Sequence, residues 1–332
     1  MRHNKTIKNN KNNKNNKNNK NNKNNKNNKN KFRYTRKHRG GGYKLSINKC
    51  NPGLKDTIDG TCFTKGIVND IKESFNKYNP KYIIKSKKST NIIKEIKEKT
   101  NCNDEKCWLR KLKPHFKNNI MNYLYRPIYP KEWKSNKNEW LSNFDILAVL
   151  KQYEAANKDF KFIGPTFIDF DEEKYEGKCV EDQLCHFDIK NYVNKKISKI
   201  GIIFNLDKHN QHGSHWVSLF VDLKENIILY FNSTGEYIED EIDRLIHRIS
   251  RQYKELKNIE LKRIINRTEH QMGDTECGMY SLFFIISMLT NTIGGDEKKT
   301  FKNYTDKINF FIKKRIDDKE MENLRDKYFI KK

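Results

Sequence analysis

The chain has 332 residues and a formal net charge of +26, and no apolar run approaches the roughly 18 residues of a membrane span. That length suffices for a catalytic domain of about 200 residues and one smaller region. Residues 1–40 hold fifteen of the Lys and Arg residues and no acid, so more than half of the net charge lies in this tail. Such a charge favours nucleic acid as a partner, but a tail that only solubilises the chain explains it equally well.

The chain divides by composition into three parts. Residues 1–43 repeat Lys-Asn-Asn with a period of three from Lys8 to Lys29, have nothing apolar to bury, and are predicted to be disordered. They end in a glycine hinge, Gly40–Gly42. Residues 44–128 predict a small, mostly helical region, and residues 129–332 predict the larger domain.

Seven cysteines, at positions 50, 62, 102, 107, 179, 185 and 277, form an odd set with no regular framework. The N-terminus lacks the apolar core of a secretory signal, so we expect a non-secreted protein in a reducing, intracellular compartment. Zinc bound by the cysteine pairs, with His186, is a weak alternative because their spacing fits no familiar zinc motif. We therefore expect no metal.

The larger domain alternates strands and amphipathic helices, which predicts an α+β fold. The strands are expected at 199–206, 216–222, 227–231 and 259–266. Helices are expected from about residue 139 to 153, at 236–256, at 281–289 and at 304–312, and Asn143 is the expected cap of the first.

The most informative stretch is the polar turn Gln271–Gly278, which delivers Cys277 to the start of a strongly apolar helix. The unpaired N–H groups and positive dipole end of a helix favour thiolate over thiol, and that makes a cysteine a nucleophile. A small buried hydrophobe is the other interpretation of Cys277.

A histidine and an amide stand where the chemistry of such a thiol requires them. His215 opens the strand at 216–222, and the hairpin that follows returns Asn232 to its side. His215 would take the thiol proton and Asn232 would orient the ring, although Asp207 or Asp222 are alternatives for that role. Gln271 could donate an N–H to the oxyanion of the reaction.

The His215-Trp216 pair, an Asn seventeen residues after the His, and Gln-x5-Cys-Gly resemble the Ulp-type SUMO protease and adenovirus protease (adenain) superfamily. The Asn in place of the usual acid is similar to a viral member from African swine fever virus. The overall pattern, including the Asn/Lys bias, resembles a member from mimivirus-like giant viruses. The resemblance implies a central mixed sheet flanked by helices, a cysteine peptidase without cofactors, and a slot for Gly-Gly walled by Trp140 and Trp216. Two core tryptophans are the alternative.

Three functions fit this resemblance. The first is a thiol endopeptidase that cuts viral structural precursors at Gly-Gly-type sites during virion maturation, in the virion or host cytoplasm. The second is a ubiquitin- or SUMO-like deconjugase acting on host conjugates, and the third is an inactive nucleic-acid-binding virion protein. Self-cleavage at Gly40–Gly42 is conceivable, although a plain linker is the simpler explanation of these glycines.

Overall fold

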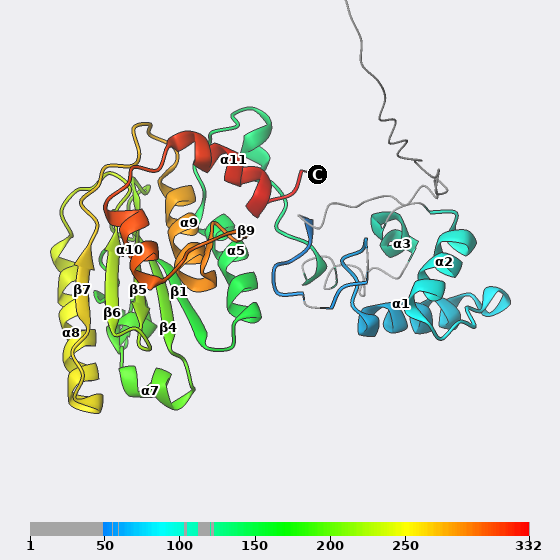
Figure 1. Ribbon diagram of the computed structural model, residues 1–332, viewed down its shortest axis with the longest axis horizontal. Helices are drawn as coiled ribbons and strands as arrows, with labels where there is room; N and C mark the ends of the chain where they lie inside the picture. The colour runs from blue at the N-terminus through cyan, green and yellow to red at the C-terminus, as the bar shows by residue number, and fades with distance from the viewer. Residues whose placement is uncertain are drawn as a thin grey trace, which may run out of the picture. The chain divides into compact units, whose positions relative to one another are not determined.

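The computed structural model describes residues 49–331 apart from 55, 59, 103–104, 112–119 and 121–122 (Figure 1). Contacts between Cα atoms divide the chain into Met1–Gly41 and Gly42–Lys332, and all described residues belong to the second unit. The predictions for the basic tail and for Gly40–Gly42 therefore lie outside the described residues.

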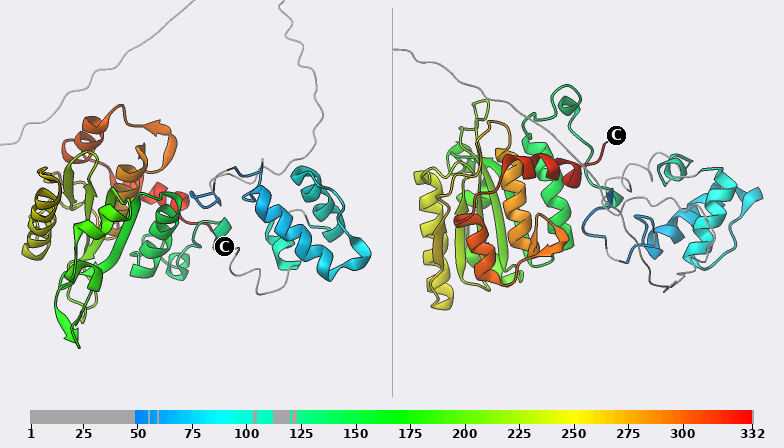
Figure 2. Two further views of the ribbon diagram at one scale, coloured as in Figure 1. Left: turned by 90° about the horizontal axis from the view of Figure 1, so that it is seen from below. Right: turned by 45° about the horizontal axis from the view of Figure 1, so that its top comes forward.

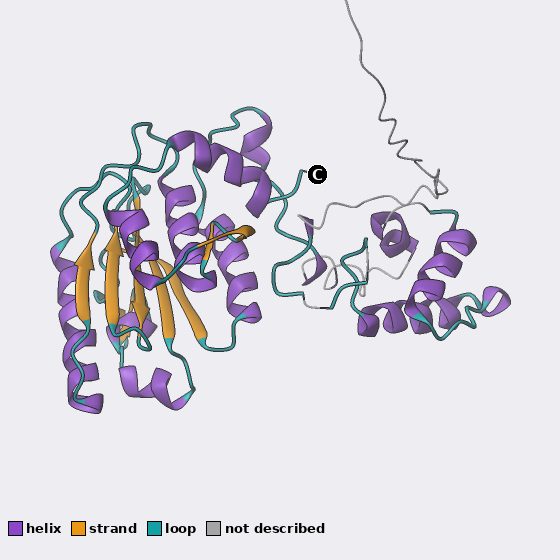
Figure 3. Ribbon diagram, in the orientation of Figure 1, coloured by secondary structure: helices purple, strands orange, loops and turns teal. Residues whose placement is uncertain are grey.

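A five-stranded mixed sheet organises the larger part of this unit (Figure 3). Its strand order is β1-β4-β5-β6-β7. The central strand β5 is antiparallel to both of its neighbours, β4 and β6, and each outer strand runs parallel to the strand beside it. The bounds are β1 Phe160–Phe167, β4 Lys199–Asn205, β5 Trp216–Asp222, β6 Ile227–Phe231 and β7 Lys262–Ile265.

Helices cover both faces of this sheet (Figure 2, right). One face packs into a core with α5 (Asn143–Ala156), α9 (Cys277–Thr290), α10 (Tyr304–Ile312) and α11 (Asp318–Tyr328). The other packs against α8 (Asp240–Lys257), α6 (Asp182–Cys185) and α7 (Ile189–Asn194). Alternate strand residues enter the two cores, as the period of two requires: Phe220 and Leu229 face α9, whereas Leu219 and Ile228 face α8.

Helix α9 runs through the middle of its layer. Every residue from Cys277 to Leu289 is buried, because the sequence CGMYSLFFIISML is apolar on all sides and such a helix is stable only inside a protein. By contrast, α8 buries only one face, which carries Ile242, Leu245, Ile246 and Ile249. The burial of α9 places its first residue, Cys277, against strand β5.

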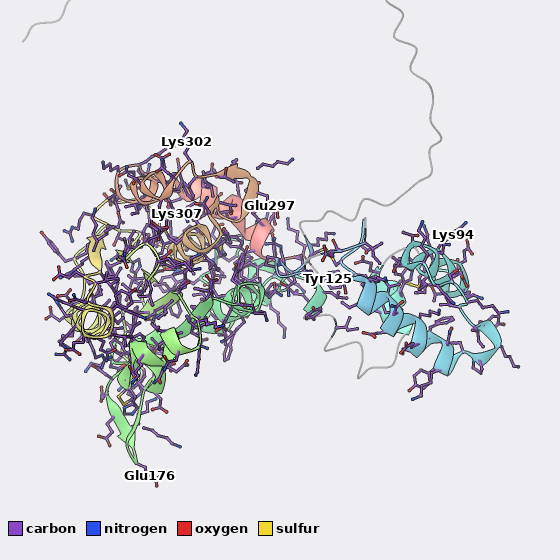
Figure 4. All side chains as sticks on the ribbon, turned by 60° about the horizontal axis from the view of Figure 1, so that its bottom comes forward. Lys94, Tyr125, Glu176, Glu297, Lys302 and Lys307 are labelled. Atoms are coloured by element: carbon purple, nitrogen blue, oxygen red, sulfur yellow. A yellow bond between two sulfur atoms is a disulfide. The ribbon has the colours of Figure 1, made fainter. Side chains whose placement is uncertain are left out.

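Two short hairpins extend from this architecture. Strands β2 (Glu173–Tyr175) and β3 (Lys178–Cys179) pair antiparallel, and Glu176 stands at the end of their turn, away from the sheet (Figure 4). Strands β8 (Thr292–Ile293) and β9 (Asp296–Thr300) form the second hairpin, directly after α9.

A separate apolar core belongs to the N-terminal region. It joins α1 (Lys65–Tyr78), α2 (Ser89–Thr100) and α3 (Glu105–Lys111), with Phe63 and Trp108 among its buried residues. Between α1 and α2 lies a short 3₁₀ turn, η2 (Pro80–Tyr82). Ile330, near the C-terminus, also packs into this core, and its N–H donates to Pro127 O.

The cysteines differ from the sequence expectation. Six of the seven pair as Cys50–Cys62, Cys102–Cys107 and Cys179–Cys185, and only Cys277 is free. The sequence did not predict this pairing. Each bridge closes a loop of at most 12 residues, so the pairing is local and its short spacings resemble no familiar disulfide domain.

The start of α5 also differs from the expectation. Ser142, rather than Asn143, is the N-cap: its hydroxyl accepts from Asp145 N, and the Asp145 carboxylate accepts from Ser142 N. This reciprocal pair satisfies two donors that the helix leaves open, which a cap at Asn143 would not do. A 3₁₀ turn, η3 (Lys131–Lys134), precedes this helix. Within the part of the chain that the structure describes, no helix is long and apolar enough to cross a membrane.

Candidate active site

Cys277 is the first residue of α9, and its side chain is 1% exposed. Its sulfur accepts hydrogen bonds from three backbone N–H groups, those of Trp216, Gly278 and Cys277 itself. Trp216 follows His215 directly, and Ser281, one turn into α9, donates to Trp216 O at 3.3 Å. The thiol therefore lies against the start of β5, beside the position of His215.

His215 is held from the other side by Asn232. The distance from His215 Nε2 to Asn232 Oδ1 is 2.8 Å, so the ring donates this N–H and leaves Nδ1 as the basic nitrogen. Thr234 also donates its N–H and its hydroxyl to the same oxygen, at 3.1 and 2.8 Å. These two bonds fix the Asn232 amide with its oxygen toward the ring.

The two aspartates that were alternatives to Asn232 are engaged elsewhere. Asp207 accepts from Gly213 N and from the Ser214 hydroxyl. Asp222, at the far end of β5, accepts from Lys224 N, Glu225 N and the Tyr304 hydroxyl. Among these three residues, only Asn232 is hydrogen-bonded to His215.

Gln271 is buried on the loop that leads to Cys277. Its Oε1 accepts from the Ser233 hydroxyl at 2.8 Å, and its Nε2 donates to Gly273 O at 2.6 Å. One N–H of the amide remains beyond the bond to Gly273, which is the group that an oxyanion donor requires.

The electrostatics of the thiol differ from the sequence expectation. Burial has the largest effect on the pKa of Cys277 and, with a small contribution from the charge of Glu276, raises it to about 11, although the three N–H groups act in the opposite direction. Burial also lowers the pKa of His215 below its usual 6.5. The sequence predicts that the helix terminus favours thiolate, but in the structure burial has the larger effect on the pKa of Cys277 and acts against it. Together with the lowered pKa of His215, this favours a neutral thiol and a neutral imidazole over an imidazolium–thiolate pair.

A cleft of about 1390 Å³ adjoins the site and is bordered by Trp140 and Trp216. Trp140 is 38% exposed, whereas Trp216 is buried and donates its Nε1–H to Leu141 O at 3.1 Å. Close packing explains why a glycine, Gly278, follows Cys277. A Cβ at this position would lie 3.1 Å from Leu141 Cβ and 3.3 Å from Trp216 Cδ1. The first turn of α9 is therefore packed closely against Leu141 and Trp216.

Four residues that support this site were not predicted. Ser233 binds Gln271, Glu276 precedes Cys277, and two α11 residues, Asp318 and Arg325, bind the turn before the cysteine. Ser233 and Glu276 were recognisable by their position beside predicted site residues. Asp318 and Arg325 lie seven residues apart, which places them on one helix face, but nothing in the sequence says what that face contacts.

Two clusters of described residues have the types and proximity of metal ligands. They are Cys179 with Cys185 and His186, and Asp169 with Glu172 and His209. In the first cluster the two sulfurs form a disulfide. In the second, His209 Nδ1 is hydrogen-bonded to Asp169 Oδ2 at 2.7 Å. Neither cluster includes Cys277, His215, Asn232 or Gln271, and the acyl-transfer chemistry of a thiol requires no metal.

A free cysteine at the start of a buried helix, beside a histidine bonded to an amide oxygen, is the arrangement of cysteine peptidases. Comparison with known proteins agrees with this class. A profile of the Ulp1 protease family, C-terminal catalytic domain, matches residues 151–332, and this chain belongs to that family and is a cysteine peptidase. The family resemblance and the α+β fold class predicted from the sequence are thus confirmed.

The similar proteins include viral ones. The chain is 28% identical over 271 residues to a protein of Acanthamoeba polyphaga mimivirus named "Putative thiol protease", covering 74% of this chain and 85% of that protein. It is 30% identical over 205 residues to the SUMO-1 cysteine protease of a Kenyan pig isolate of African swine fever virus, covering 58% and 69%. The crystal structure of an African swine fever virus protease shares the fold, with a TM-score of 0.57 and 22% identity over 86% of this chain and 96% of that one.

Proposed function

We propose that this cysteine peptidase cleaves viral structural precursors at Gly-Gly-type sites during virion maturation, with Cys277 as its nucleophile. The observation that carries the assignment of the site is the 2.8 Å hydrogen bond between His215 and Asn232, because it leaves Nδ1 of the ring free to act as a base. The buried Cys277 thiol lies against the backbone of the next residue, Trp216. In this proposal His215 is the general base and acid, Asn232 orients its ring, and Gln271 with the N–H of Cys277 binds the oxyanion.

The reaction begins with transfer of the Cys277 thiol proton to Nδ1 of His215. The sulfur bonds to the scissile carbonyl carbon, and the electron pair of the C=O bond moves to oxygen, where the two N–H donors stabilise it. When this intermediate collapses, the C–N bond breaks and the imidazolium gives its proton to the leaving amine. His215 then takes a proton from water, the resulting hydroxide displaces the sulfur, and the acid product and free thiol are released.

The walls of the cleft support glycine next to the scissile bond. Trp140 and Trp216 both border the cleft, and Trp216 is fixed by its bond to Leu141 and by its contact with the turn of Cys277. In this proposal the substrate passes between the two rings, and a Gly-Gly sequence needs room there for its backbone alone. Viral relatives support a viral substrate.

A deconjugase is the second candidate, favoured by the family and by the similarity to the SUMO-1 cysteine protease of African swine fever virus. It would use the same catalytic groups on a ubiquitin-like C-terminus. The division at residue 128 and nucleic-acid binding by the basic tail are further proposals. The separate apolar core of the N-terminal region supports the first, and the charge of residues 1–40 supports the second.

Two probes separate the candidates, each tested with the wild type and with Cys277→Ala. One is a Gly-Gly-X peptide of viral type, and the other is ubiquitin or SUMO with a thiol-trapping C-terminus. We expect cleavage of the peptide and its complete loss in Cys277→Ala. Capture by the ubiquitin-like probe alone would favour the deconjugase. Peptide cleavage that persists in Cys277→Ala would refute the assigned nucleophile.

A further inference from the structure

Helix α11 contacts the turn of the nucleophile at two points. Its first residue, Asp318, accepts through Oδ2 from Met272 N at 3.0 Å and from Gly273 N at 3.1 Å. Asp318 Oδ1 accepts from the Tyr280 hydroxyl at 2.9 Å, one turn into α9. A single carboxylate thus joins the beginning of the turn to the helix that carries Cys277.

Arg325 makes the second contact, two helical turns further along. Its Nη2 lies 2.8 and 2.9 Å from the two oxygens of Glu276, and its Nε lies 3.2 Å from one of them. The two side chains are only 5% and 4% exposed. Because both side chains are buried, the guanidinium and the carboxylate cannot exchange each other for water. The pair therefore fixes the position of Glu276, the residue next to Cys277.

The same guanidinium also holds the segment before the tryptophan wall. Arg325 Nη1 donates to Glu139 O at 2.8 Å, and the Trp133 Nε1–H donates to that oxygen at 2.9 Å. The guanidinium also lies over the Trp133 ring, with Arg325 Cζ 4.3 Å from the ring centroid. Glu139 directly precedes Trp140, so one side chain connects the nucleophile turn to the residue that borders the cleft.

From these contacts we infer that α11 is a positioning element of the active site. Asp318 and Arg325, on one face of the helix and about 10 Å apart along it, hold the turn 272–276 between them. Arg325 additionally sets the distance between Cys277 and the Trp140 wall. The inference rests on the proposed role of Cys277. It adds that activity also requires an intact helix α11, which contains none of the proposed catalytic residues.

The two contacts predict different kinetic effects. Loss of Arg325 frees both the nucleophile and the wall, so we expect Arg325→Ala to lower kcat at least about 10-fold and to raise KM as well, since small displacements of reacting groups are costly. Asp318 does not contact the 138–139 segment, so Asp318→Ala should lower kcat with a smaller change in KM. Asp318→Ala also carries the test should Arg325→Ala fail to fold.

Arg248 is a matched control. It is a partly buried arginine on α8 that donates to Cys185 O and Leu184 O, on the opposite face of the sheet. The full-length wild type and the three variants are compared at a temperature at which circular dichroism shows all of them folded. Arg248→Ala should lose thermal stability but retain kcat and KM. Guanidinium chloride at millimolar concentration should raise kcat of Arg325→Ala several-fold. It should not raise kcat of Asp318→Ala or Arg248→Ala.

Alkylation of Cys277 by iodoacetamide gives a readout that requires no substrate, because the other six cysteines are in disulfides. We expect Arg325→Ala and Asp318→Ala to change its rate relative to Arg248→Ala. Folded Arg325→Ala and Asp318→Ala proteins with the kinetics and alkylation rate of Arg248→Ala would overturn the inference. Peptide cleavage that survives in Cys277→Ala would instead refute the proposed nucleophile.

Discussion

Ser233 and Gln271 are joined by a buried hydrogen bond, from the Ser233 hydroxyl to Gln271 Oε1 at 2.8 Å. The carbonyl of Ser233 also accepts from His270 N and Gln271 N, at 2.8 and 2.9 Å. Ser233 directly follows Asn232, so the strand end that orients His215 also orients the proposed oxyanion donor. With Oε1 committed to Ser233, the donor end of the Gln271 amide is the end left to face the turn of Cys277.

This arrangement predicts graded losses of activity. Gln271→Ala should lower kcat by about 100-fold, as the loss of one oxyanion donor does elsewhere. Ser233→Ala removes one supporting hydrogen bond and should cost about 10-fold or less. Steady-state kinetics on the Gly-Gly-X peptide measures both effects.

Ser218→Ala is the control for Ser233→Ala. Ser218, on β5, is also buried, but its hydroxyl has no hydrogen-bond partner among the described residues. Its loss should leave kcat unchanged and should not lower the melting temperature. Equal kinetics for Ser233→Ala and Ser218→Ala would show that the Ser233 bond does not position Gln271.

Asn232 predicts a contrast between two substitutions. Asn232→Ala leaves the His215 ring without its acceptor and should reduce kcat/KM at least about 10-fold. Asn232→Asp keeps the acceptor and removes Nδ2, which is buried without a partner in the described part of the chain. It should retain much of the activity. A carboxylate beside His215 raises its pKa, so the acid side of the pH–rate profile should move to higher pH.

The pH–rate profiles of wild type, Asn232→Asp and Asn232→Ala test this contrast. Thr234→Val serves as a control, because it removes the Thr234 hydroxyl from Asn232 Oδ1 but keeps the backbone N–H bond. It should have a smaller effect than Asn232→Ala. An Asn232→Asp profile that coincides with that of the wild type would argue against direct contact between this side chain and the catalytic ring.

The sequence predicted the inner part of the fold well. The expected bounds of β5, β6 and α10 match the structure, because alternating or helical apolar periods end there at clear turn residues. Strand β1 was not predicted. Its sequence, FKFIGPTF, contains Gly164-Pro165, which argues against an inner strand, and the structure places it at the edge of the sheet, where proline is tolerated.

Some features of the site were not predictable from local sequence. The helix terminus at Cys277 is visible in the sequence, but the burial that raises the thiol pKa depends on packing against β5 and the Leu141 segment. Helix α8 begins at Asp240 rather than at Glu236. The Glu239 side chain before it accepts from the Tyr230 hydroxyl at 2.8 Å, a contact between residues on different elements. Periodicity does not report such contacts.

The pKa shifts of Cys277 and His215 predict the pH dependence of the free enzyme. His215 must be neutral to accept the thiol proton, and burial lowers its pKa, so the acid side of kcat/KM should have its midpoint below pH 6.5. Alkylation by iodoacetamide needs thiolate. With a pKa of about 11 for Cys277, its rate should keep rising as the pH increases through 9.

His215→Ala is the comparison that interprets the alkylation profile. If the resting thiol is neutral, this variant should show a similar rise at alkaline pH, because no ion pair is lost. A fast plateau of alkylation between about pH 5 and 7 that His215→Ala abolishes would contradict the prediction. It would show a preformed imidazolium–thiolate pair in the free enzyme.

Substitution of Gly278 tests whether the start of α9 is coupled to Leu141 and Trp216, the residues packed against it. In Gly278→Ala the new methyl would lie 3.1 Å from Leu141 Cβ and 3.3 Å from Trp216 Cδ1, so Leu141 or Trp216 must move by a few tenths of an ångström. Overpacking of this kind costs about 1–3 kcal/mol of unfolding free energy. Because both neighbours shape the cleft, KM for the Gly-Gly-X peptide should rise several-fold.

Gly66→Ala is the matched control for Gly278→Ala. A Cβ at Gly66, in helix α1, would meet only Thr64 Oγ1, at 3.9 Å, so the substitution introduces no overpacking. Stability should rise by up to about 1 kcal/mol, because alanine restricts the unfolded chain more than glycine does, and KM should stay unchanged. An unchanged KM in a destabilised Gly278→Ala protein would mean that the wall and the nucleophile turn move independently.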